Sequence, residues 1–152
     1  MLRQLLRYGK TIAQAAFRHP IVGVTLIPVL EDGSIVLVQR VDDGRWSLPG
    51  GFVDWGETLP QAAARELREE TGLTLVAVGR LVGVYSDPDR DPRVHSISIA
   101  LEVRAEGTCG VQDTLEISAA TAFAPDRLPP PPLSHDHSRQ LQDYLTQTTR
   151  VA

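Results

Sequence analysis

The chain has 152 residues, of which 42% are hydrophobic and 22% charged, and its formal net charge at pH 7 is −4. This length suits one domain with a substantial core, and the acidic balance gives no support to nucleic acid as a partner. Cys109 is the only cysteine, which excludes an intramolecular disulfide and a metal site of paired cysteines. Because no apolar run reaches the roughly 18 to 20 residues of a membrane span, we expect a cytoplasmic protein with no membrane span.

Residues 1–18 mix leucines with basic residues in a loose amphipathic helical pattern. Such a helix packs on its own domain or on a partner subunit, as in a homodimer. Basic amphipathic helices also lie on membrane surfaces, so that alternative stays open. We expect the folded domain to span residues 20–152.

Four strands are expected from runs of β-branched and apolar residues. Residues 22–30 and 35–40 flank the turn signal Glu31–Ser34, which predicts a hairpin. Strands over residues 75–84 and 96–103 are expected further along, and the second alternates apolar and polar residues. Strands with helices before and between them predict an α/β layered domain.

Helices are predicted in the middle and at the end of the chain. The central helix begins at about Leu59, because Thr58 and Gln61 form a capping box, and Gly72 supplies a left-handed stop. Near the end, Ser134 is expected to cap a helix behind the proline run. The apolar side of this last helix is expected to carry Leu141, Tyr144 and Leu145.

Three glutamates crowd one side of the central helix. Glu66, Glu69 and Glu70 fall within an arc of roughly 100°, where their charges repel. A divalent cation reverses that repulsion, and carboxylate oxygens suit Mg²⁺ or Mn²⁺ better than Zn²⁺. The pair Gly50 and Gly51 lets the backbone approach the same metal or a phosphate.

The stretch from Gly51 to Leu73 carries a longer signature. Five residues separate Gly51 from Glu57, and seven more precede RELREETGL, which begins at Arg65. This spacing resembles the box of the Nudix hydrolases at every defined position, and the flanks resemble the family over residues 22–145. The resemblance implies an α/β/α sandwich with a mixed β-sheet. It also implies hydrolysis of a nucleoside diphosphate linked to another moiety, with Mg²⁺ or Mn²⁺ as cofactor.

The resemblance also implies roles for individual residues. The metal ligands would be the Gly50 carbonyl, Glu66, Glu69 and Glu70, and Glu66 is alternatively the base that takes a proton from water. The family often uses one more acid from outside the box. The candidates for it are Glu106, Asp113 and Glu116. We favour Glu116, because it precedes the segment where a family acid often lies.

Three box residues are expected to support these ligands. Gly51 belongs to the close backbone approach, whereas Glu57 and Arg65 are charged residues that resemble the family's supporting positions. Arg65 is expected to pair with Glu69 or Glu70 and hold it in position. Ordinary surface pairing is the alternative interpretation of both charged residues.

A second segment points to the substrate. Pro88 lies about fifteen residues after the box, as in the family's ADP-ribose diphosphatases, and residues 90–95 resemble their RDPRGH segment with Val94 in place of glycine. Arg90 and Arg93 are candidate phosphate partners, and His95 a candidate substrate contact.

Trp46 is a candidate for stacking on a base. His135 and His137 show no metal-ligand spacing with the acids, so they are interpreted as surface residues.

The leading hypothesis is hydrolysis of ADP-ribose to AMP and ribose 5-phosphate. A nucleoside triphosphate pyrophosphohydrolase or a hydrolase of another ADP-sugar is an alternative within the same chemistry. A non-catalytic module that senses ADP-ribose is the alternative from another class.

Overall fold

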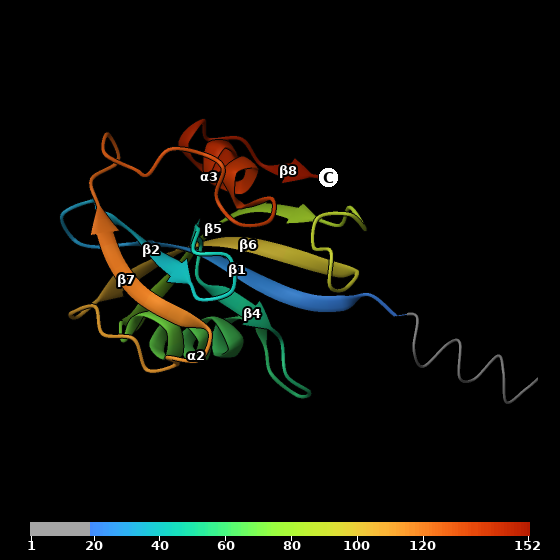
Figure 1. The fold of residues 1–152 in the computed structure, drawn as a ribbon, viewed down its shortest axis with the longest axis horizontal. Helices are drawn as coiled ribbons and strands as arrows, with labels where there is room; N and C mark the ends of the chain where they lie inside the picture. Colours follow the sequence, from blue (N-terminus) through green and yellow to red (C-terminus); the bar gives the residue numbers. More distant parts are fainter. Residues whose placement is uncertain (1–18) are drawn as a thin grey trace, which may run out of the picture.

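The computed structural model describes residues 19–152 (Figure 1). The predicted N-terminal helix, and any dimer contact through it, lies outside the described residues. The elements in chain order are β1 (Ile21–Val29), β2 (Ile35–Arg40), β3 (Trp46–Ser47), β4 (Gly50–Phe52), α2 (Leu59–Thr71), β5 (Thr74–Tyr85), β6 (Ser96–Glu106), β7 (Ile117–Phe123), α3 (His137–Leu145) and β8 (Arg150–Val151). The four predicted strands are confirmed, although β6 runs three residues further than expected.

The strands form one mixed sheet in the order β3-β2-β1-β6-β5-β8, with β4 paired to β1 and β7 paired to β2. Strand β1 runs parallel to β6 from Ile21↔Ser96 to Val29↔Arg104, and β5 runs parallel to β8. The other pairs are antiparallel. The predicted hairpin is confirmed at its turn, but β1 and β2 pair only at Val29↔Ile35. The two strands then diverge, and β2 pairs with β7.

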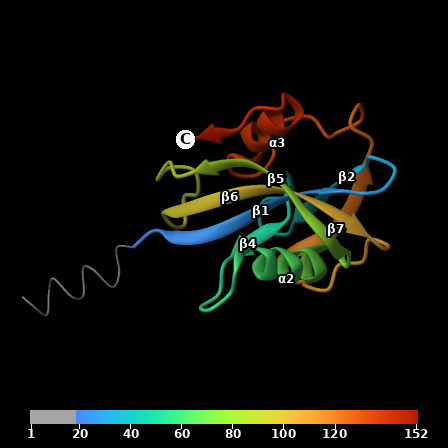
Figure 2. The same ribbon diagram turned by 180° about the vertical axis from the view of Figure 1, so that it is seen from behind.

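Helices α2 and α3 lie on opposite faces of this sheet (Figures 1 and 2). The strands have side-chain period 2, so β1 places Val24 and Leu26 in the apolar cluster under α2 and Ile27 in the cluster under α3. Burial of both faces accounts for the apolar character of β1. The predicted α/β/α sandwich with a mixed sheet is therefore confirmed.

Helix α2 has the predicted ends. The backbone N–H of Thr58 donates to Gln61 Oε1 (2.8 Å), and Gly72 adopts a left-handed conformation (φ 73°) in which its N–H donates to the Arg68 carbonyl. Leu67 is fully buried against the sheet, which fixes the rotation of the helix. No helix within residues 19–152 has the length and apolar character needed to cross a bilayer.

The predicted cap of the last helix is wrong. Helix α3 begins at His137 with Asp136 as its N-cap residue, two residues after the expected cap. Ser134 is fully buried, and its hydroxyl donates to Asp43 Oδ2 (2.6 Å) and is not available as a cap. Leu141 is buried as expected, whereas Leu145 is exposed. The hydroxyl of Ser134 instead ties this segment to the loop after β2.

Candidate active site

A cavity of about 380 Å³ opens where β4, α2 and the loops before β6 and β7 meet. Two groups of charged or titratable side chains line it. We call the first the acidic cluster: Glu66, Glu69, Glu70, Asp113 and Glu116. We call the second the basic cluster: Arg40, Arg90, Arg93, His135 and His137. The ten residues of the two clusters come from five separate segments of the chain, which the fold brings together at one polar site.

Glu70 is the most buried carboxylate of the acidic cluster, with 6% of the residue exposed. The backbone N–H of Gly50 donates to its Oε2 (2.9 Å). Burial raises the pKa of Glu70 to about 8, the Gly50 N–H opposes that rise, and the charges of Glu66 and Glu116 add to it. Its ionised form thus needs a nearby positive charge.

Glu66 lies beside the backbone of Gly51. A Cβ at Gly51 would overlap the Glu66 carboxylate, so only glycine leaves room for this side chain. Burial raises the pKa of Glu66, while its ion pair with Arg65 opposes the rise. The glycine pair of β4 therefore contacts two box glutamates, Glu70 through the N–H of Gly50 and Glu66 through the space that Gly51 leaves.

Arg65 holds this group of carboxylates together. Its Nε and Nη2 donate to the two Glu57 oxygens (2.8 Å each), and its Nη1 donates to Glu66 Oε1 (2.6 Å). A longer bond of 3.4 Å reaches Glu69, and Nη2 also donates to the Phe52 carbonyl. The expected pairing is thus present with Glu69 and absent for Glu70. Its main partners by distance are Glu57 and Glu66, and the bidentate pair with Glu57 is the geometry that favours a strong ion pair.

The Glu57–Arg65 pair predicts a pH-dependent contribution to stability. The hydrogen bonds from Arg65 lower the pKa of Glu57 from 4.5 to about 2 in the folded protein. The unfolded chain therefore takes up this proton first as pH falls. We expect the difference in Tm between the wild type and Glu57→Gln to be fully present above about pH 5 and to shrink as pH falls towards about 2. A difference that is the same at about pH 6 and about pH 3 would contradict this assignment.

Glu116 reaches the site through backbone contacts of the loop before β7. The N–H groups of Gln112 and Asp113 donate to the carbonyl of Glu69 (3.0 and 2.9 Å), which has no partner inside the last turn of α2. The N–H of Val41 donates to the carbonyl of Glu116 (2.8 Å). These contacts bring Glu116 to the cavity, as expected, together with Asp113. Glu106, at the end of β6, does not line it.

The acidic cluster fits a hard divalent cation in its donor chemistry. Glu66 Oε2 and Glu70 Oε1 make no hydrogen bond to any residue within 19–152, so each offers a free oxygen. No three His, Cys, Asp or Glu side chains in that range already converge as a ligand set. Oxygen donors alone suit Mg²⁺ or Mn²⁺.

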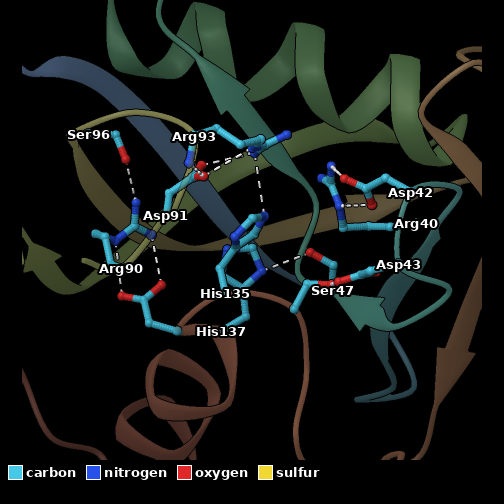
Figure 3. Close-up of polar contacts among 12 residues, drawn as sticks. Arg40, Asp42, Asp43, Ser47, Arg90, Asp91, Arg93, Ser96, His135 and His137 are labelled. Carbon is cyan, nitrogen blue, oxygen red and sulfur yellow. Dashed lines mark hydrogen bonds and ion pairs between the residues drawn. The ribbon is translucent and has the colours of Figure 1, made fainter. Parts of the chain in front are cut away.

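Arg90 has a structural role that the sequence did not indicate. Its Nε and Nη2 donate to Asp136 (3.0 and 2.8 Å) and its Nη1 donates to Ser96 Oγ (2.6 Å), as Figure 3 shows. Its side chain is 7% exposed. Because all three donor nitrogens are occupied, Arg90 ties the start of α3 to β6. The expected phosphate contact gains no support from this placement.

Arg93 remains available at the cavity. It pairs with Asp91 through Nε (3.0 Å) and Nη2 (2.9 Å), but its side chain is 52% exposed. Its Nη1 has no hydrogen bond to residues 19–152. An anionic ligand could therefore bind Arg93 without displacing Asp91.

The structure places two expected substrate contacts away from the cavity. Trp46 packs edge-on against Phe123, with ring centroids 5.0 Å apart, because β3 turns it towards the cluster under α3. His95 is exposed, and its Nε2 lies 3.2 Å from the Ser86 carbonyl. Neither lines the cavity.

His137 was interpreted as a surface residue, and that interpretation is wrong. It is 8% exposed, and its Nδ1 accepts the N–H of Leu48 (3.1 Å) and lies 2.8 Å from Ser47 Oγ. Burial lowers the pKa of His137 to about 3, so the ring is neutral and its proton is on Nε2. Its neighbour His135 is half-buried and packs edge-on against it.

Arg40 is a second charged or titratable residue at the cavity that the sequence did not connect with the site. It lies at the end of β2 and pairs with Asp42 through Nε (2.9 Å) and Nη2 (2.7 Å). Its charge partly opposes the rise that burial causes in the pKa of Glu70. No local spacing connects Arg40 or His137 with the box. The only sequence signal for either was its residue type.

A mixed α/β/α sandwich in which three glutamates of one helix lie beside a glycine pair is typical of a hydrolase of the Nudix type. The NUDIX domain model matches residues 19–144, and the chain belongs to this family of hydrolases.

Three known proteins illustrate the similarity. The chain is 42% identical over 151 residues to the ADP-ribose pyrophosphatase of Methanocaldococcus jannaschii, covering 91% of this chain and 85% of that protein. It is 46% identical over 74 residues to the 8-oxo-(d)GTP phosphatase of Mycolicibacterium smegmatis, covering 47% and 22%. The crystal structure of an ADP-ribose pyrophosphatase from Streptococcus suis superposes with a TM-score of 0.70 at 28% identity, covering 88% of this chain and 100% of that one.

Proposed function

We propose that this protein hydrolyses ADP-ribose to AMP and ribose 5-phosphate with Mg²⁺ or Mn²⁺ as cofactor. One observation carries the proposal: the box glutamates and the loop of Asp91 and Arg93 line the same cavity. These two segments carried the separate sequence signals for the reaction and for the substrate. The relative from Methanocaldococcus jannaschii supports the same substrate, because the match covers most of both chains.

In this proposal, Glu66, Glu69, Glu70 and the Gly50 carbonyl hold the cation. A bound divalent cation neutralises diphosphate oxygens and makes a nearby water more acidic. Water attacks one phosphorus, and the bridging P–O bond to the other phosphate breaks. Glu66 Oε2 or the Glu116 carboxylate accepts the proton of the water. Arg65 orients Glu66, and the free Nη1 of Arg93 binds a phosphate oxygen.

A nucleoside triphosphate is the second candidate substrate. The similarity to the Mycolicibacterium smegmatis phosphatase favours it, although this match spans less than half of the chain. Arg40 and Arg93 both line the cavity, and two guanidinium groups suit a substrate with an additional phosphate. Other ADP-sugars share the same reaction.

A substrate panel tests the proposal. We expect the purified protein to release AMP from ADP-ribose in Mg²⁺ or Mn²⁺ and to release none in EDTA, because the acidic cluster needs the cation. Chromatography of the products over ADP-ribose, other ADP-sugars, dGTP and 8-oxo-dGTP ranks the substrates by kcat/KM. Faster cleavage of a triphosphate would replace ADP-ribose as the substrate. Calorimetric binding of ADP-ribose without AMP release would instead support the sensing module.

A further inference from the structure

The imidazole of His137 is held at the cavity by only one of its two ring nitrogens. Leu48 can only donate through its backbone N–H, so Nδ1 must be the acceptor. Ser47 Oγ lies on the same nitrogen at 2.8 Å. Both partners belong to β3 or the residue after it, and His137 is the first residue of α3. The ring orientation and tautomer are therefore fixed before any ligand binds.

The other nitrogen has nothing to bind. Nε2 carries the proton of the neutral ring and makes no hydrogen bond to any residue within 19–152. This atom is not among the fully buried polar atoms without a partner, so its N–H is open to the cavity. His137 is more than nine-tenths buried and lines the cavity, and Figure 3 shows it between α3 and Ser47, beside His135. An N–H that faces the cavity and has no partner among these residues is available to donate to a ligand. Nδ1 alone anchors the ring, which leaves the N–H of Nε2 free for a ligand in the cavity.

We propose that His137 is a specificity-determining residue that donates a hydrogen bond from Nε2 to an oxygen of the bound nucleotide. This inference rests on the proposed function only in that the cavity binds a nucleotide. His137 and Arg93 line the same cavity, so the acceptor in this proposal is a hydroxyl or phosphate oxygen of the part of the substrate that lies against Arg93 and α3. A neutral N–H can donate to either kind of oxygen, and the fixed tautomer selects against a substrate group that also donates there.

Three variants test the inference. His137→Leu fills the space without a donor, and His137→Gln keeps an amide donor near the position of Nε2. Ser134→Ala is the matched control, because it also removes a buried hydrogen bond from this segment but does not line the cavity. We expect His137→Leu to raise KM about 10-fold with kcat within about 3-fold of wild type, and His137→Gln to recover part of that loss. Ser134→Ala should leave both constants unchanged.

A spectroscopic measurement covers the case in which His137→Leu does not fold. Long-range ¹H–¹⁵N spectra of the wild type report the tautomer and the Nε2 environment directly. We expect the Nε2–H form in the free protein and a change of the Nε2 shift on adding ADP-ribose without metal. A ring protonated on Nδ1, or an Nε2 shift that ignores a ligand shown to bind by calorimetry, would overturn the inference.

The two proposals can fail separately. The kinetic comparison uses the fastest substrate of the panel, so cleavage of another nucleotide refutes ADP-ribose and still tests His137. If ADP-ribose is cleaved and His137→Leu has the KM of Ser134→Ala, the proposed function stands and the role of His137 is refuted. A wild type that neither cleaves nor binds any nucleotide of the panel refutes both.

Discussion

Glu70→Gln is expected to lower kcat at least ~100-fold in Mg²⁺ without lowering Tm. Glutamine has the same shape and can still accept the N–H of Gly50, so the contact between α2 and β4 survives. The change removes a carboxylate whose charged form is opposed by burial, and the loss of that charge does not cost stability. Only the charge that would bind the cation is lost. Steady-state kinetics and thermal unfolding of the same preparation check both halves of the result.

Glu106→Gln is the matched control for Glu70→Gln. It removes the same charge from an exposed position at the end of β6, away from the cavity. We expect its kcat and its dependence on Mg²⁺ to equal those of the wild type. A Glu70→Gln protein with wild-type kcat, or activity of the wild type in excess EDTA, would refute the role of the acidic cluster in binding a cation.

The central helix was predictable because its signals are local. Thr58, Gln61 and Gly72 fix the two ends of α2 through contacts within a few residues, and helical spacing alone places the three box glutamates on one side. The glycines of β4 follow directly from the same contiguous signature. The positions of the box glutamates and of the glycines beside them could therefore be predicted from the sequence alone.

The basic half depends on contacts between distant segments, which no local pattern records. Arg90 looked like a phosphate ligand, but Asp136, 46 residues later, occupies its guanidinium. His137 looked exposed, but α3 docks it on Ser47, 90 residues earlier. Strand β7 was missed for a related reason: it pairs with β2, and only Ile117 in it is buried, so it lacks a clear apolar alternation.

Gly50→Ala is expected to lose mainly stability and Gly51→Ala mainly activity, although the two residues are neighbours in β4. A Cβ at Gly50 would overlap the Val24 carbonyl and lie 2.9 Å from Thr25 Cα, and the residue has φ +152°. Backbone of β1 cannot move aside without breaking its pairing with β4. We expect the free energy of unfolding to fall by about 3 kcal/mol, from the overlap and the strained φ together.

At Gly51 the Cβ meets only the Glu66 carboxylate, which is the free end of a flexible side chain. That carboxylate can rotate away, so we expect Gly51→Ala to lower the free energy of unfolding by less than about 1 kcal/mol. Rotation would take Glu66 from its place beside Arg65 and Glu70, and we expect kcat to fall about 10-fold or more. Denaturant unfolding and kinetics of the two variants side by side check the contrast. Equal losses of stability in both would contradict the assignment of Gly51 to the glutamate site, because the overlap there would then involve backbone rather than a movable carboxylate.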